Sequence, residues 1–131
     1  AARRTDEDLA AVEAALNAMA VAADDADAMV AADVLFHRAV LEAAHNELLS
    51  RMEVVLSAGL QLRDQFVHHS KRGSDPIPAH RALYEAIANL DADLAGKTVE
   101  ALLRQSSIDL AATRDYAERQ ARREKRARRT G

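Results

Sequence analysis

Alanine dominates this sequence and limits the folds that the chain can adopt. Thirty of the 131 residues are alanine, and leucine, arginine and glutamate, which are also good helix formers, are abundant. Strand-favouring β-branched residues are few (nine Val, three Ile and four Thr), and only four Gly and two Pro interrupt the chain. The sequence therefore predicts one all-α domain, in which small alanine side chains let the helices pack closely.

Several classes of protein are excluded by what the sequence lacks. There is no cysteine, so a disulfide framework, a thiolate zinc site and a cysteine nucleophile are all excluded. No apolar run approaches the ~20 residues of a membrane span and no signal peptide opens the chain, so we expect a cytoplasmic protein with no membrane contact. Aromatic residues make up 3% of the chain and there is no Trp, which argues against base-stacking recognition of nucleic acid. No Gly-rich loop follows a strand and no Ser–His–Asp order stands out, so we do not expect an enzyme.

Charge is distributed unevenly along the chain. Residues 114–131 carry eight basic and three acidic side chains, a balance of +5, which leaves −8 on residues 1–113 because the total is −3. A basic tail from about residue 117 fits a solvated helix end, where cations favour the negative end of the helix dipole. It also fits a contact with an acidic partner or a nucleic acid.

Hydrophobic periodicity divides the first half of the chain into three predicted helices. The first begins at Thr5, where Asp8 completes a capping box. The second begins after the acidic residues 24, 25 and 27 and runs to about His45, and Asn46 then breaks the chain or caps the third helix, over residues 48–66. The expected apolar faces are Leu9, Val12, Leu16 and Met19 in the first helix, and Val30, Val34 and Leu41 in the second, with Leu48 if it continues.

A loop at residues 71–78 separates these helices from two more. Gly73 and two prolines cannot continue a helix without a large penalty. A fifth helix begins at Asp91 or Asp93 and loses its apolar face after Tyr116, and the last residues are expected to fray or to be disordered. Short connections imply antiparallel neighbours, and therefore an up-and-down bundle. The expected apolar positions are His80, Leu83, Tyr84, Ile87 and Leu90 in the fourth helix, and Leu94, Val99, Leu102, Leu103, Ser106 and Leu110 in the fifth.

Three side chains of metal-ligand type fall on these helices. Asp33 and His37 are four residues apart, so both project from one helix face and can share a divalent cation. His80 lies on the apolar face of the fourth helix. An Asp–His ion pair and a core histidine bonded to a carbonyl or to Tyr84 are the alternative interpretations of these residues.

Arg63 is the candidate for binding an anion. It lies midway along the third predicted helix, and a guanidinium can hold a carboxylate through two hydrogen bonds. The alternative is an ordinary surface arginine paired with Asp64 or another acid.

Two segments resemble the signatures of a known family. Residues 33–46, DVLFHRAVLEAAHN, resemble the D-x-x-F-H-R-A…A-x-x-N motif of the FadR-type C-terminal ligand-binding (FCD) domain of GntR-family bacterial transcriptional regulators. Residues 80–91, HRALYEAIANLD, are similar to the second signature of that family, and the resemblance extends from about Thr5 to Tyr116. It implies an antiparallel α-helical bundle, in agreement with the periodicity.

The resemblance also implies a function for the chain. It makes residues 1–131 an effector-binding and dimerisation domain that takes a small carboxylic acid and forms a homodimer. Operator DNA is bound by an N-terminal winged helix-turn-helix, which this chain lacks together with the first helix of the bundle. Asp33, His37 and His80 match three of the four metal ligands of the family, and Leu102 stands where the fourth, a histidine, is expected. Zinc or nickel would then bind weakly or be absent, because three ligands hold a metal less tightly than four.

Two other functions remain open from the residues themselves. One is a stand-alone helical metal-binding or enzyme-like bundle, built around the same three side chains. The other is a helical interaction module whose basic tail contacts a partner.

Overall fold

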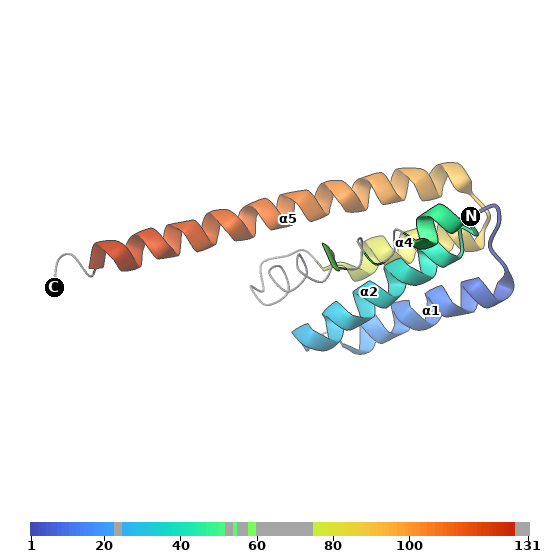
Figure 1. Cartoon of the computed structure of the whole chain (residues 1–131), viewed down its shortest axis with the longest axis horizontal. Coiled ribbons are helices and arrows are strands. Elements are labelled where there is room, and N and C mark those ends of the chain that lie inside the picture. The colour runs from blue at the N-terminus through green and yellow to red at the C-terminus, as the bar shows by residue number, and fades with distance from the viewer. Residues whose placement is uncertain (23–24, 52–53, 55–57, 60–74, 128–131) are drawn as a thin grey trace.

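The chain folds into an antiparallel helical bundle, as the composition predicts (Figure 1). The computed structural model describes residues 1–22, 25–51, 54, 58–59 and 75–127. Its helices are α1 (Asp6–Val21), α2 (Ala26–Glu42), α4 (Ile77–Ala88) and α5 (Ala92–Ala127), and these described residues contain no strand. Helix α1 packs against α2 and α4, and α4 packs against α5.

Helix α1 begins as the capping box predicts. Thr5 is the N-cap: its hydroxyl accepts a hydrogen bond from the backbone N–H of Asp8 (3.1 Å), and its own N–H donates to the Asp8 carboxylate (2.7 Å). His45, just beyond the end of α2, places Nε2 2.6 Å from the same carboxylate oxygen. The start of α1 is therefore tied to the end of α2.

The charge on Asp8 is expected to contribute to stability in a pH-dependent way. The backbone and the hydroxyl of Thr5, followed by His45, lower the pKa of Asp8 from 3.8 to about 2. A carboxyl with a lowered pKa stabilises the fold above its unfolded pKa and loses that contribution as the pH falls to its folded pKa. Asp8→Asn should lower the free energy of unfolding by about 1 kcal/mol at neutral pH, and the difference from wild type should disappear between about pH 4 and about pH 2. Urea unfolding across this range measures it, and a pH-independent difference would contradict the assignment.

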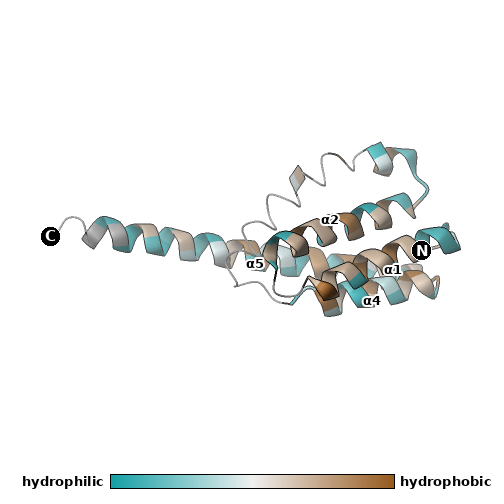
Figure 2. Ribbon diagram, turned by 90° about the horizontal axis from the view of Figure 1, so that it is seen from below, coloured by the Kyte–Doolittle hydropathy of each residue, from teal (hydrophilic) through white to brown (hydrophobic). Residues whose placement is uncertain are grey.

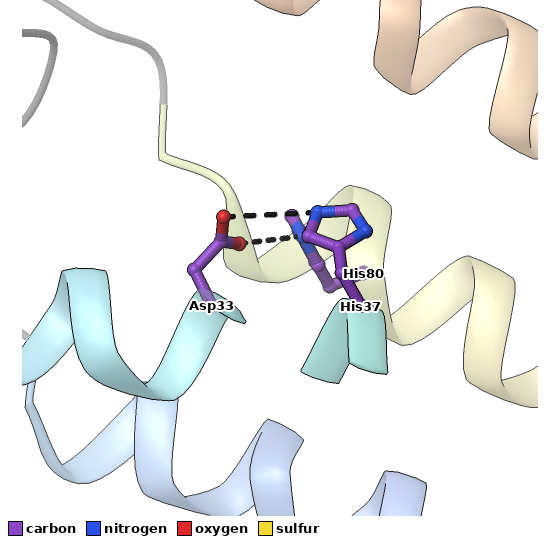
Figure 3. Close-up of side chains that lie close together, drawn as sticks. All are labelled: Asp33, His37 and His80. Carbon is purple, nitrogen blue, oxygen red and sulfur yellow. Dashed lines mark hydrogen bonds and ion pairs between the residues drawn. The ribbon is translucent and has the colours of Figure 1, made fainter. Parts of the chain in front are cut away.

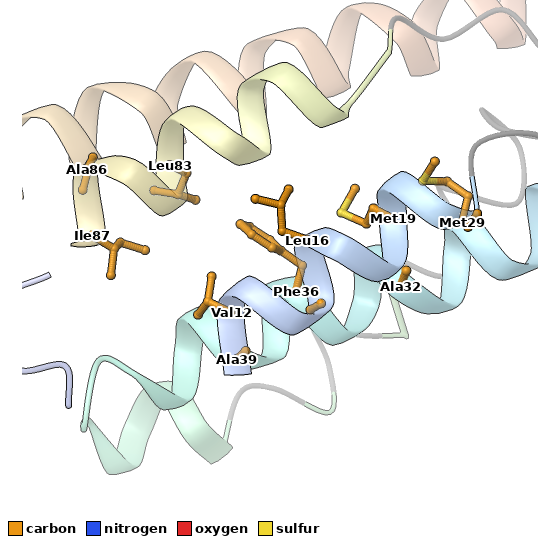
Figure 4. Close-up of a cluster of buried hydrophobic side chains, with 13 residues drawn as sticks. Val12, Leu16, Met19, Met29, Ala32, Phe36, Ala39, Leu83, Ala86 and Ile87 are labelled. Carbon is orange, nitrogen blue, oxygen red and sulfur yellow. The ribbon is translucent and has the colours of Figure 1, made fainter. Parts of the chain in front are cut away.

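The core lies between α1, α2 and α4 (Figure 4). Val12, Leu16 and Met19 of α1 are buried in it, as expected, and Leu9 packs at its edge. The expectation for α2 is partly wrong. Val30 is buried, but Val34 and Leu41 are only half-buried, and the side chains of α2 that join the core cluster are Met29, Ala32, Phe36 and Ala39.

The reason for this difference is the amount of alanine on α2. The row that joins the core contains Ala32 and Ala39, so in the sequence it looks less apolar than the neighbouring row of Val and Leu. Its small side chains nevertheless let α1 and α2 approach more closely. Leu48 was expected to extend the apolar row and is 66% exposed, because α2 ends at Glu42. The predicted break is confirmed: the Asn46 side chain accepts hydrogen bonds from the N–H groups of Leu48 and Leu49, as an N-cap does. Most of the third predicted helix, including Arg63, lies outside the described residues.

Helix α4 begins earlier and ends earlier than expected. Ile77 and Pro78, which were assigned to the loop, form its first turn, where the missing N–H of proline has no cost. The helix ends at Ala88, so Leu90 is not on its apolar face but is 54% exposed. Leu90 has φ 57°, its N–H donates to the Ile87 carbonyl (3.1 Å), and the N–H of Asp91 donates to the Ala86 carbonyl (2.9 Å). These bonds form a Schellman motif with leucine at the position that glycine usually occupies.

Replacing this leucine with glycine is expected to stabilise the protein. A residue with a Cβ is strained in the left-handed region, whereas glycine is not. Leu90→Gly should raise the free energy of unfolding by about 1 kcal/mol relative to Leu90→Ala, which loses the same exposed side chain but keeps the Cβ. Denaturant unfolding of the two variants compares them directly, and equal stabilities would show that the strain is absent.

Helix α5 is the longest of the described helices, with 36 residues, and its C-terminal half extends past the others (Figures 1 and 2). The Asp91 carboxylate accepts from the N–H of Leu94 (2.8 Å) at its start, in agreement with the predicted boundary. Ala95 and Leu102 pack into the bundle, but four predicted apolar positions are exposed, against expectation: Leu94, Val99, Leu103 and Leu110.

The basic segment from residue 117 continues α5 to Ala127, which fits a solvated helix end. The last residues of the chain, which were expected to fray or to be disordered, include residues 128–131, which lie outside the described residues. No helix among the described residues is both long and apolar enough to cross a membrane.

Candidate metal centre

The three predicted metal-ligand side chains lie together inside the bundle (Figure 3). Asp33 and His37 come from adjacent turns of α2, and His80 comes from the first turn of α4, 43 residues beyond His37. The Asp33 side chain is completely buried, His80 is almost so, and His37 is partly exposed. The site is therefore formed by side chains that meet from two helices distant in sequence.

Close contacts join the three groups. Nε2 of His80 lies 2.8 Å from Oδ1 of Asp33, and Nε2 of His37 lies 3.7 Å from Oδ2 of the same carboxylate. The two Nε2 atoms are 3.4 Å apart. One ligand atom from each residue can be chosen so that all three lie within 4.8 Å of one another.

Neighbouring groups hold the two imidazoles in place. The Phe36 ring makes edge-to-face contacts with both, at 4.8 Å from the His80 centroid and 5.8 Å from that of His37. On its other nitrogen, Nδ1, His80 contacts the carbonyl oxygen of Pro76 at 2.7 Å. Neither Phe36 nor Pro76 was identified as part of the site from the sequence. The only signal in the sequence for the contact between the Pro76 carbonyl and His80 is that the two residues are four positions apart. The carbonyl itself gives no signal, because every residue has one.

The arrangement has the chemistry of a divalent metal site. One carboxylate and two imidazoles are ligands that zinc and nickel accept, and three protein ligands leave coordination positions for water or another molecule. A buried carboxylate is costly unless a cation or a set of hydrogen bonds compensates its charge. The donor set and its burial therefore fit a metal ion held by Asp33, His37 and His80.

The other residues singled out in the sequence are not among these contacts or lie outside the described residues. Leu102 is half-buried and packs against the core cluster that includes Phe36. His45, assigned no ligand role, pairs with Asp8. Arg63, the candidate anion contact, lies outside the described residues.

Comparison with known proteins gives two matches. The family model of the FCD domain matches residues 1–105. The galactonate operon transcriptional repressor of Escherichia coli (strain K12) is 30% identical over 109 residues, which cover 82% of this chain and 48% of the repressor. The chain thus spans about half the length of that relative. The FCD match includes α1, α2, α4 and the first part of α5, and therefore Asp33, His37 and His80.

Proposed function

The chain belongs to the family of FCD domains, and from this membership we propose that it is the effector-binding and dimerisation domain of a GntR-family transcriptional regulator. The similarity to a transcriptional repressor supports this role. In the intact regulator, operator DNA would be bound by an N-terminal winged helix-turn-helix, and the present domain would sense a small molecule. A sensor role accounts for the family match better than catalysis does.

The observation that carries the metal part of the proposal is the meeting of three ligand atoms inside the bundle. Asp33, His37 and His80 would hold one zinc or nickel ion. Bound there, the metal would act as a Lewis acid that attracts a carboxylate. Leu102, in place of a fourth histidine, would leave the affinity lower than that of a four-ligand site.

The proposed effector is a small organic acid. A metal with open positions and an arginine both favour a carboxylate, and Arg63 is the proposed second contact. The name of the matched relative contains galactonate, a carboxylic acid, which agrees with this chemical class.

Metal analysis of the purified protein tests the proposal. Protein prepared without chelator and supplied with zinc or nickel should hold about one ion per chain, and Asp33→Ala should hold almost none. Glu42→Ala, which removes an exposed carboxylate from the same helix, is the matched control and should bind as wild type does. Equal and negligible metal in all three proteins would show that the three side chains only bond to one another.

A thermal-shift screen tests the effector class separately. A ligand at a hundred times its dissociation constant should stabilise the fold by about 2.7 kcal/mol. Stabilisation by another class of compound, and by no organic acid, would contradict the carboxylate proposal.

Light scattering tests dimerisation, and a 14.3 kDa species alone at high protein concentration would contradict the proposed dimer.

One observation favours a second function, that of an interaction module. The basic end of α5 extends past the other described helices as a continuous helix, and Arg119, Arg122 and Arg123 on it are exposed. Salt-sensitive binding of an acidic polymer by the wild type, and its loss in Arg122→Gln/Arg123→Gln, would support that function.

A further inference from the structure

The Pro76 carbonyl accepts two hydrogen bonds from one residue. The backbone N–H of His80 donates to it at 3.2 Å, as the first bond of α4, and the ring nitrogen Nδ1 lies 2.7 Å from the same oxygen. A carbonyl oxygen can only accept, so a hydrogen bond of this length requires the proton to be on Nδ1. The structure therefore specifies which nitrogen of His80 carries a hydrogen.

We propose that the turn at residues 75–77 is a positioning element that keeps His80 protonated on Nδ1, so that Nε2 is its ligand atom. The proposal rests on the metal role described above, and it adds the residues that choose the ligand atom. The bond made by one ring nitrogen decides which nitrogen of a histidine binds metal, and it also fixes the ring orientation.

The turn is built so that this carbonyl has little freedom. Pro76 has a ring-restricted φ of −76° with ψ −23°, so its carbonyl already points along the axis of α4. The Asp75 carboxylate accepts a hydrogen bond from the backbone N–H of Ile77 at 3.0 Å, which links the residues on either side of Pro76. Phe36 packs edge-on against the His80 ring, 4.8 Å away, and restricts its rotation.

The position of Nε2 shows what this protonation state achieves. With the proton on Nδ1, a neutral His80 directs a lone pair at a point that lies near Asp33 Oδ1 (2.8 Å) and His37 Nε2 (3.4 Å). A carboxylate oxygen and a lone pair at 2.8 Å repel each other unless a cation lies between them. The opposite protonation state would place a proton between Nε2 and Asp33, and would make His80 a donor instead of a ligand. The Pro76 bond therefore disfavours a hydrogen bond between a neutral His80 and Asp33, and it leaves two ways to satisfy the 2.8 Å contact: a metal ion between the two atoms, or a second proton on Nε2 that makes His80 an imidazolium.

Nitrogen-15 NMR of the imidazole side chains tests the proposal directly. The His80 signals are assigned by their absence from the spectrum of His80→Gln. In zinc-loaded protein, we expect Nε2 to be bound to zinc and Nδ1 to carry a slowly exchanging proton. Zinc on Nδ1, or an Nδ1 without a proton, would overturn the proposal.

The metal-free protein separates this proposal from the metal proposal. If the chain binds no zinc, the proposed metal role fails, but His80 should still show a slowly exchanging Nδ1 proton bonded to Pro76. A metal-free His80 with its only proton on Nε2 would overturn the tautomer proposal.

Variants of the turn test whether it positions the ring. Pro76→Gly keeps the carbonyl but removes the restriction on φ that fixes the direction of the carbonyl. Zinc affinity should fall by about tenfold, the low end of the range for groups that hydrogen-bond to metal ligands. Pro78→Ala, which changes the neighbouring proline outside this turn, is the matched control and should bind zinc as wild type does. Equal zinc affinity in Pro76→Gly and wild type would show that the turn has no positioning role, and circular dichroism verifies that both variants remain helical.

Discussion

The Leu102→His variant is expected to bind zinc at least about tenfold more tightly than the wild type. Leucine occupies the position at which the family resemblance places a fourth ligand, and its half-buried side chain packs against the core cluster that includes Phe36. A third imidazole, as the fourth ligand, would complete the tetrahedral set that zinc prefers. A direct ligand should contribute at least as much as an outer partner, whose loss costs about 10–100-fold in affinity. Competition with a chromophoric chelator measures the two dissociation constants.

The adjacent leucine provides the control for this gain. Leu103 is 64% exposed, so Leu103→His adds the same imidazole to the same helix turn while it remains in solvent. Its zinc affinity should equal that of the wild type. If the zinc affinity of both variants rises equally, the added histidine binds zinc at the surface. If the zinc affinity of neither variant rises, position 102 does not face Asp33, His37 and His80.

The Phe36→Ala variant is expected to lose about 3–5 kcal/mol of unfolding free energy. Phe36 has no exposed surface, belongs to the core cluster and contacts both imidazoles of the site. Truncation removes a large apolar side chain and leaves a cavity that rigid helices fill only in part. Because a domain of this size is stable by only about 5–15 kcal/mol, the loss should lower the denaturation midpoint markedly.

Leu35→Ala is the matched control for this loss. Leu35 precedes Phe36 on α2 and is 53% exposed, so its truncation should change the stability by no more than about 0.5 kcal/mol. Urea unfolding followed by circular dichroism compares the two. A loss below about 1 kcal/mol in Phe36→Ala would mean that the interior closes around the cavity, and that Phe36 is not central to the core.

The sequence predicts the helical class and the start of α1 well, because these depend on local chemistry. The bonds between Thr5 and Asp8 join residues three positions apart, and Val12, Leu16 and Met19 form one row of large apolar side chains on that helix. The grouping of Asp33 with His37 follows equally from a spacing of four. Their meeting with His80 was anticipated for two reasons: each residue lies on or beside an apolar face that was expected to turn inward, and the family resemblance matches all three to metal ligands.

Features that depend on packing or on the backbone were predicted poorly. Helix α2 has two competing rows, and the choice between them depends on how closely α1 approaches its alanines, which periodicity does not reveal. Leu90 lies three residues after Ile87 and so continues the apolar spacing of α4. The helix nevertheless ends at Ala88, where the hydrogen bonds of the Schellman motif turn the chain away. The Pro76 carbonyl could not be selected from the sequence, because its role depends on the direction of a group common to all residues.

The length of α5 has a mechanical consequence. One uninterrupted helix connects Leu102, at the core, with Ala127, beyond the other described helices, and the rise between these residues is about 37 Å. A rigid rod of that length acts as a lever: a tilt of about 5° at Leu102 displaces the far end by about 3 Å. Movements at the core too small to repack a side chain are thus magnified at the basic end to the size of an atomic contact.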